Sequence, residues 1–182
     1  MNAFRSHWVD WLKAIIVALL FATIIRAFFF ISYEVRGESM MPSAYDGERF
    51  IINKVGYNFV EPDRFDLIVF HATETEDYIK RVIALPGDTV QYVDDRLYIN
   101  GEYVDEPFLV ERVEEGNRMP YTYDFAYPQV IPEGHVFVLG DNRPYSKDSR
   151  MIGPISYESI VGKVDMRFWP ITAAGWMNDA KE

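Results

Sequence analysis

The sequence has no cysteine and only three histidines among its 182 residues. Without cysteine, no disulfide holds the fold, and no thiolate can attack a carbonyl or ligate a metal. His7 precedes the long apolar run described below, which leaves His71 and His135 for the body of the chain. No His-Glu-x-x-His motif occurs, so a metallohydrolase is disfavoured and we expect neither a metal ion nor a cofactor.

Positive charge is also scarce, since 18 Lys and Arg against 28 Asp and Glu give a net charge of −10. Arg5, Lys13 and Arg26 fall in the first 33 residues, so the remainder is more acidic still. Such a body repels phosphates, and we expect no nucleic-acid partner. Disorder is disfavoured as well, because 49% of the residues are hydrophobic and 16% are aromatic.

Residues 14–33 form a long apolar run that is interrupted only by Thr23, Arg26 and Ser32. About 20 apolar residues in a helix cross the core of a bilayer, and aromatic residues at both ends of the run suit the two interfaces. A cleaved signal peptide would place small residues soon after its apolar core, where this chain has Arg26 and three phenylalanines. We expect residues 1–33 to be a cytoplasmic N-terminus and an uncleaved transmembrane helix.

The flanking charges predict the direction of this helix. Arg5 and Lys13 precede most of the run and favour a cytoplasmic N-terminus, because positively charged flanks stay inside. Arg26 would cost roughly 2.5–3.5 kcal/mol at the bilayer centre. A span that starts earlier, near Trp11, would let its guanidinium reach the headgroups. The rest of the chain would then be extracytoplasmic.

Short apolar runs bounded by turn residues follow, as buried strands do. The clearest are residues 50–52, 67–70, 136–139 and the alternating run 89–93. Asn100-Gly101 is a strong hairpin signal. We expect residues 34–182 to form a mainly β catalytic body built on antiparallel sheet. Within it, residues 94–132 should form a small loop-rich β lobe between the core halves, because their second part is rich in Glu, Tyr, Pro and Asn.

Ser39 lies in a glycine- and proline-containing stretch, residues 35–43, directly after the apolar run. Gly37 permits unusual backbone angles or the close approach of a peptide, and Pro42 holds Met41 extended. A serine in such a turn can stand at a strand end with its own N–H facing the same point, where an oxyanion would be stabilised. On this stretch alone, an ordinary turn serine is the more common explanation.

Lys80 falls inside the predicted strand 77–83, on the same face as Tyr78 and Val82. An ammonium among apolar neighbours has a lowered pKa. A shift from about 10.4 to about 7–8 costs roughly 4 kcal/mol, which is usually retained where the neutral amine has a task. A neutral lysine can take a proton from a serine such as Ser39. The alternative is a lysine that guards a strand edge.

A third stretch, residues 140–150, is dense in short polar side chains and follows the predicted strand 136–139. Such a loop can hold a site together by side-chain hydrogen bonds and Asp–Arg pairs. A solvated surface loop has the same composition, so this stretch alone does not decide between the two interpretations.

Together, in this order and behind an N-terminal anchor, the three stretches resemble the signature boxes of type I signal peptidases, the serine–lysine endopeptidases that remove signal peptides. The resemblance runs from the anchor to about Trp169-Pro170, and the short middle lobe is similar to the compact Gram-positive form. It implies that Ser39 is the nucleophile and Lys80 the general base. Matching supporting residues are Ser146, which orients the lysine, and the pairs Asp148–Arg150 and Asp141–Arg81. Matching substrate-cleft residues are Tyr33, Val35, Met40 and Ile79.

The sequence departs from the family pattern at three positions. Some family members carry, two residues before the nucleophile, a serine that donates to the oxyanion. Gly37 stands there in this chain and leaves the backbone N–H of Ser39 as the chief donor. Ala84 and Phe65 replace glycines that are common in the family, so both larger side chains must fit the local packing.

The resemblance also implies a course of reaction. The signal-peptide region of an exported preprotein would lie extended along the cleft. Neutral Lys80 would take the proton of Ser39, and an acyl-enzyme would form and be hydrolysed. The expected partners are therefore the preprotein and the lipid bilayer of the cell membrane.

Other classes of protein fit the sequence less well. A Ser–His–Asp protease would need His71 or His135 beside Ser39. The penicillin-binding type needs Ser-x-x-Lys and Lys-Thr-Gly, which do not occur. Self-cleaving repressors need a DNA-binding domain rather than an anchor. The non-enzymatic alternative is a membrane-anchored β module that binds extended peptides without cleavage, in which a lysine among apolar neighbours would have no use.

Overall fold

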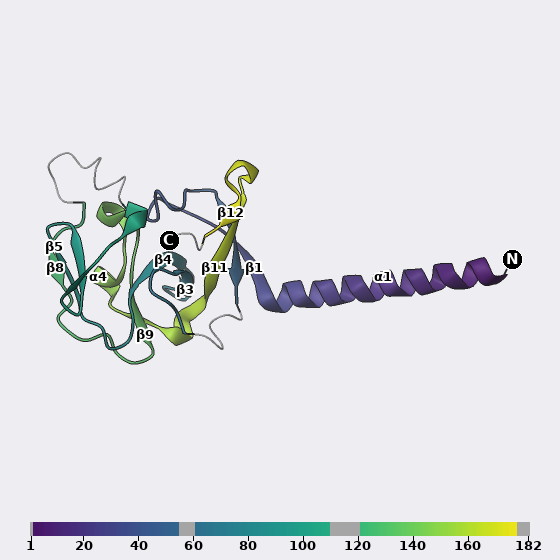
Figure 1. The fold of residues 1–182 in the computed structure, drawn as a ribbon, viewed down its shortest axis with the longest axis horizontal. Coiled ribbons are helices and arrows are strands. Elements are labelled where there is room, and N and C mark those ends of the chain that lie inside the picture. The colour runs from purple at the N-terminus through teal and green to yellow at the C-terminus, as the bar shows by residue number, and fades with distance from the viewer. Residues whose placement is uncertain (1, 55–60, 110–120, 178–182) are drawn as a thin grey trace.

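The computed structural model describes residues 2–54, 61–109 and 121–177. Part of the expected small lobe, residues 110–120, and the side chain of Arg26 lie outside this description. A 28-residue helix, α1 (Asn2–Phe29), extends from a body made of strands (Figure 1). Within the described residues, no helix is both long enough and apolar enough to cross a membrane.

The helix ends earlier than the apolar run does. Residues 30–33, which we expected to belong to the anchor, are part of strand β1 (Phe30–Glu34) instead. This strand pairs antiparallel with β2 (Arg49–Asn53), in a register that runs from Phe30 opposite Asn53 to Glu34 opposite Arg49. The pairing overrides the apolar pattern because it satisfies the backbone groups of β1, and its aromatic residues suit a strand.

The body is built on an eight-stranded sheet in which every pair is antiparallel. The order is β1–β2–β11–β3–β4–β9–β10, with β12 paired to β11. The remaining strands are β3 (Leu67–His71), β4 (Asp77–Ala84), β9 (His135–Leu139), β10 (Ile155–Ser156), β11 (Ile160–Trp169) and β12 (Gly175–Trp176). The strands predicted at 50–52, 67–70, 77–83 and 136–139 are therefore confirmed.

Strand β11 was not predicted, although it lies between β2 and β3 and is ten residues long. Only Gly162 and Val164 of its residues are buried, so its hydrophobic pattern is weak. A side chain at Gly162 would overlap the carbonyl oxygen of Asn53 on β2. Strand β11 can therefore approach β2 closely because Gly162 has no side chain, and a hydropathy pattern does not reveal such a contact.

A second, four-stranded sheet is formed within residues 90–126. Its order is β7–β6–β5–β8, all antiparallel, with bounds β5 (Val90–Val93), β6 (Arg96–Ile99), β7 (Glu102–Val104) and β8 (Phe125–Ala126). The predicted hairpin at Asn100-Gly101 joins β6 to β7, and both residues have the positive φ angles, 55° and 82°, that such a turn requires. The mainly β, antiparallel fold class is thus confirmed.

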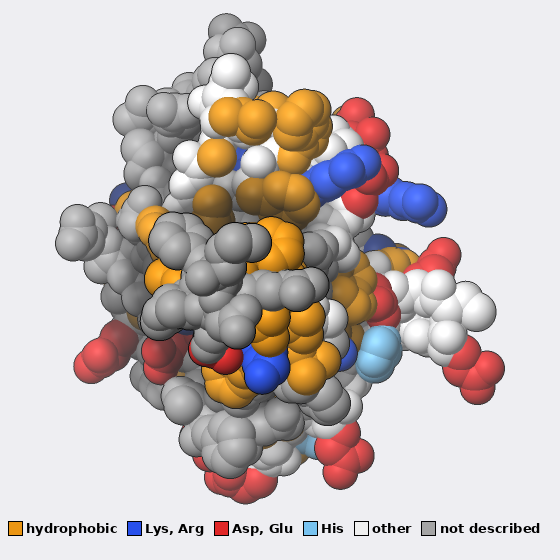
Figure 2. Space-filling model, turned by 90° about the vertical axis from the view of Figure 1, so that its right-hand side faces the viewer, with side chains coloured by type: hydrophobic (Ala, Val, Ile, Leu, Met, Phe, Trp, Pro, Cys, Tyr) orange, Lys and Arg blue, Asp and Glu red, His pale blue; other side chains and the backbone are white. Residues whose placement is uncertain are grey.

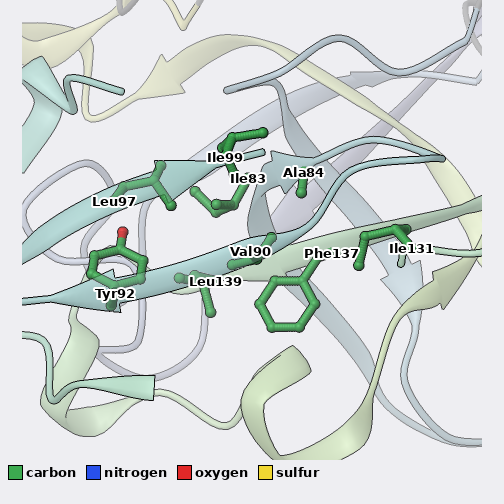
Figure 3. Packing of buried hydrophobic residues seen from close by; sticks show 9 residues of the cluster. All are labelled: Ile83, Ala84, Val90, Tyr92, Leu97, Ile99, Ile131, Phe137 and Leu139. Atoms are coloured by element: carbon green, nitrogen blue, oxygen red, sulfur yellow. The ribbon is translucent and has the colours of Figure 1, made fainter. Parts of the chain in front are cut away.

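One hydrophobic cluster holds the two sheets together (Figure 3). The eight-stranded sheet contributes residues of β4 and β9, and the four-stranded sheet contributes residues of β5 and β6. The members are Ile83, Ala84, Val90, Tyr92, Leu97, Ile99, Ile131, Phe137 and Leu139, all at most 5% exposed. The second sheet is therefore packed onto the strand that carries Lys80, and burial of this cluster supplies the main attraction between the sheets.

Helical structure within the described part of the body is short. The loop after β9 contains η2 (Arg143–Tyr145) and α4 (Ser149–Ile152), where the Asp148 side chain caps α4 by accepting from the Arg150 N–H. The other turns are η1 (Pro107–Leu109), η3 (Tyr157–Ser159) and η4 (Ile171–Ala173). The loop from Gly140 to Arg150 is thus anchored at both ends, by β9 and by α4.

Candidate active site

Ser39 and Lys80 lie side by side although 41 residues separate them in the chain. Ser39 occupies the turn after β1, and Lys80 projects from the middle of β4. The amine Nζ of Lys80 is 2.7 Å from Ser39 Oγ and also donates to the carbonyl oxygen of Ile79 at 3.0 Å. Only 3% of Lys80 is exposed. A serine hydroxyl and a buried amine at this distance have the geometry of a nucleophile and its base.

Burial lowers the pKa of Lys80 from 10.5 to about 8. The carboxylates of Asp148 and Asp141 oppose this shift, but loss of solvation outweighs them. The ring of Tyr78 also lies beside the amine, 5.2 Å from Nζ. A pKa near 8 means that an appreciable fraction of the amine is neutral close to physiological pH, and the neutral form is the one that can accept a proton.

Asn142 holds the turn that presents Ser39. Its backbone N–H donates to the Ser39 carbonyl oxygen at 3.0 Å, and its side-chain Nδ2 donates to the Glu38 carbonyl oxygen at 2.9 Å. On the other side of the turn, the Gly37 N–H donates to Asp46 Oδ1 at 2.7 Å, and Gly37 has a φ of 87°. The turn therefore needs glycine at position 37. Sequence reasoning missed Asn142 and Asp46, because both act through hydrogen bonds to backbone groups that no sequence motif marks.

Ser146 and the turn that holds Ser39 both lie against Gly140. A Cβ placed on Gly140 would overlap Ser146 Oγ and would lie 2.5 Å from the Ser39 carbonyl oxygen. The Ser146 hydroxyl is buried and has no hydrogen-bond partner among the described residues. The contact by which the family resemblance has Ser146 orient Lys80 is therefore not formed as a hydrogen bond in this structure.

Two buried arginine–aspartate pairs flank the dyad. Arg81, the residue after Lys80, binds Asp141 at 2.7 Å, with side chains 2% and 0% exposed. Its guanidinium also donates to Ser43 Oγ at 3.0 Å, which ties β4 to the end of the turn that holds Ser39. Arg150 binds Asp148 at 2.8 Å, and Asp148 accepts from the Gly140 N–H at 3.1 Å. The structure thus forms both pairs that the family resemblance implies.

A groove of about 590 Å³ opens at the dyad. One wall is formed by residues 32–40 and the other by residues 77–80. All four predicted cleft residues line it, namely Tyr33, Val35, Met40 and Ile79, and so does Gly37. Val35 and Met40 are 5% and 2% exposed, so they form an apolar floor rather than projecting into solvent. Among the described strands β1 pairs only with β2, so its other edge is free along this groove.

Asp77 belongs to one wall of the groove and is hydrogen-bonded to Tyr33 on the other wall. Its carboxylate accepts a hydrogen bond from the Tyr33 hydroxyl at 2.6 Å and lies 2.6 Å from His71 Nδ1. Asp77 begins β4 three residues before Lys80, which is about 10 Å along a strand. The Tyr33 contact was not predicted, because it depends on how β1 and β4 face one another.

The histidines are placed elsewhere. Neither His71 nor His135 lines the groove, and within the described ranges no histidine is hydrogen-bonded to Ser39. The imidazole of His71 is 61% exposed and bonds Asp77 instead. A Ser–His–Asp arrangement is therefore absent from the described part of the chain, and Lys80 is the basic group at Ser39.

Comparison with known proteins identifies related chains. The family model described as signal peptidase, peptidase S26, matches residues 8–169. Signal peptidase IB of Staphylococcus aureus is 42% identical over 92% of this chain and 93% of its own, and signal peptidase I of Bacillus caldolyticus is 46% identical over 85% and 87%. The crystal structure of a signal peptidase I from Enterococcus faecalis V583 superposes with a TM-score of 0.55, at 40% identity, over 58% of this chain and 97% of that one.

A strand-built body with a buried amine at a serine is the arrangement of a serine-class peptidase, and the matches extend over most of the chain. The chain therefore belongs to the signal peptidase family, peptidase S26. It is accordingly a serine endopeptidase.

Gly140→Ala should lower peptidase activity at least about tenfold, because the new methyl group would push against Ser39 and Ser146 and misplace the hydroxyl. Gly175→Ala is the matched control, since no atom lies within 4 Å of the position that its new methyl group would take and the backbone there is unstrained. The measurement is kcat/KM on a peptide that spans a signal-peptide cleavage region, with the thermal midpoint of each variant. Equal activity of the two variants would contradict the close packing of the turn.

Proposed function

We propose that the protein is a membrane-bound endopeptidase that removes N-terminal signal peptides from exported preproteins, with Ser39 as nucleophile and neutral Lys80 as general base. The observation that carries this proposal is the 2.7 Å contact between Lys80 Nζ and Ser39 Oγ, at the end of a groove, with the lysine pKa lowered to about 8. The relatives are named signal peptidases, and these names support a signal-peptide region as the substrate.

The proposed reaction uses one amine twice. Neutral Lys80 accepts the Ser39 proton while Oγ bonds to the scissile carbonyl carbon. The ammonium then returns the proton to the departing amine, the peptide C–N bond breaks, and the signal peptide stays esterified to Ser39. Water, deprotonated by the same lysine, attacks the ester and releases the signal-peptide carboxylate with Ser39 restored. No step needs an oxidant, a metal or a cofactor.

The groove suits an extended peptide. The free edge of β1 offers backbone groups for strand addition, which reads main chain rather than side chains. Tyr33, Val35, Met40 and Ile79 border the path, and the buried apolar floor leaves room for small side chains near the cut. The N–H of Ser39 is the proposed oxyanion donor, with Gly37 allowing the substrate carbonyl to approach closely.

The proposal also places α1 in the bilayer, with the N-terminus in the cytoplasm and residues 34–182 outside. Support comes from its exposed apolar side chains, which include Ile15, Ile16, Val17 and Phe21 at 52–64%. Figure 2 looks at the side of the molecule from which α1 projects, and hydrophobic side chains occupy much of its described surface. A mostly apolar cavity of about 650 Å³, lined by residues of β1, β2, β11 and β12 that include Phe30 and Trp176, fits contact with lipid.

Replacing either member of the dyad should abolish processing. We expect Ser39→Ala and Lys80→Ala to lower kcat at least about 10³-fold, because each removes a group that the reaction requires. Circular dichroism and peptide binding should stay near those of the unsubstituted protein. Lys54→Ala, at an exposed lysine that does not line the groove, is the control and should stay active. Substantial cleavage by Lys80→Ala would mean that another base is used, and binding without cleavage by the unsubstituted protein would favour the peptide-binding module.

Activity should rise with pH. The neutral amine is the active form, so below the Lys80 pKa of about 8 the value of kcat/KM should increase about tenfold per pH unit, and it should level off above that pKa. The measurement is a steady-state profile from pH 6 to pH 10 in detergent, with circular dichroism at each pH as a control for unfolding. A profile that stays flat down to pH 6 would exclude an amine of this pKa as the base.

The membrane placement predicts how the protein fractionates. The full-length chain should stay with membranes after a carbonate wash at high pH, and deletion of residues 2–29 should weaken that association. Protease added outside the cytoplasmic membrane should reach the body but spare the N-terminus. Release of the full-length chain by the wash would show that α1 is not an integral anchor.

A further inference from the structure

Three side chains form a buried unit where the second sheet meets the loop after β9. Arg143 Nη2 lies 2.6 Å from Glu106 Oε1, with side chains 0% and 8% exposed. The hydroxyl of Tyr92, on β5, is hydrogen-bonded both to Arg143 Nη1 and to Glu106 Oε2. Glu106 and Tyr92 belong to the segment that forms the second sheet, whereas Arg143 belongs to the loop between β9 and α4. The unit therefore links two parts of the body by charge as well as by packing.

Arg143 lies in the loop that contacts the Ser39 turn and Arg81, the residue after Lys80. Its Nε donates to the Gly140 carbonyl oxygen at 3.0 Å, which fixes the curvature of the loop. The residue before it, Asn142, bonds the Ser39 turn, and Asp141 pairs with Arg81 beside Lys80. A shift of Arg143 would therefore move groups that position the nucleophile on one side and the base strand on the other.

Glu106 is what makes a buried guanidinium tolerable at this position. Burial alone would lower the pKa of Arg143. Glu106 gives the largest of the contributions that oppose this, and together with those of Tyr92 and Asp141 it raises the pKa. Asp141 also attracts Arg143, more weakly. Without Glu106, the charge of Arg143 would be drawn to Asp141, which is already the partner of Arg81. Two arginines would then compete for the carboxylate that aligns the strand of Lys80.

We infer that Glu106 is a positioning residue for the Ser39–Lys80 dyad, acting through Arg143 and the loop at residues 140–143. The second sheet is then a support of the active site, not only a lobe packed beside it. This inference rests on the proposed function of Ser39 and Lys80. In this proposal Glu106 does not contact the substrate. Loss of Glu106 should therefore lower the rate of the chemical step rather than weaken substrate binding.

The test is Glu106→Gln in the full-length protein in detergent. With a fluorogenic peptide spanning a signal-peptide cleavage region, kcat should fall roughly tenfold, since small displacements of reacting groups are costly. The KM should stay within about twofold, because residues 32–35 and 77–80 of the groove are untouched. Tyr92→Phe removes only the hydroxyl shared by Arg143 and Glu106 and should lower kcat by a smaller factor. Glu106→Asp, which restores the charge, should recover part of the rate.

Asp88→Asn provides the matched control for stability. Asp88 pairs with Arg64 at 3.0 Å, is also buried and borders the second sheet, but none of its hydrogen bonds reaches residues 140–143. Assays are run well below the thermal midpoints of all variants. A normal kcat in Glu106→Gln and Tyr92→Phe, with only the midpoints lowered, would overturn the inference, as would a rise in KM alone. If Glu106→Gln does not fold, Tyr92→Phe decides. An inactive unsubstituted protein would instead refute the proposed function.

Discussion

Burial of one amine is the constraint on which the rest of this structure depends. Holding the pKa of Lys80 at about 8 instead of 10.5 costs roughly 3 kcal/mol, which the surrounding fold must supply. Strand β4 supplies it by lying between β3 and β9 and by carrying, on its last residues, part of the cluster that binds the second sheet. The packing of the two sheets thus makes it possible to keep the amine away from water and within 2.7 Å of Ser39.

The carboxylates near the Lys80 amine only partly oppose the lowering of its pKa. Two carboxylates, Asp148 and Asp141, oppose the lowering of the Lys80 pKa, and each is paired with an arginine that offsets part of its charge. The same carboxylates bond the backbone of the loop at residues 140–150 or the strand beside Lys80. One set of ion pairs therefore shapes the loop, aligns the strand and restrains the electrostatic environment of the base.

The sequence predicted those parts of the molecule that depend on local pattern. Alternation along residues 77–83 placed Lys80 on the face of Tyr78 and Val82, and the turn signals marked most strands. Strand β11 was missed because its packing against β2 depends on Gly162, and Val164 is its only fully buried apolar side chain. The roles of Asn142 and Glu106 were missed for another reason. They bond partners more than 30 residues away in the chain, and no spacing rule reports such contacts.

The direct connection of α1 to β1 has a mechanical consequence. No linker separates Phe29 from Phe30, and the five residues of β1 span about 17 Å before the turn that holds Ser39. With α1 in the bilayer as proposed, the reactive hydroxyl stands at a nearly constant height above the lipid. The height of Ser39 above the lipid would then help to select the bond that is cut. A peptide bond that emerges too close to the surface, or too far from it, would not reach the hydroxyl, whatever side chains flank it.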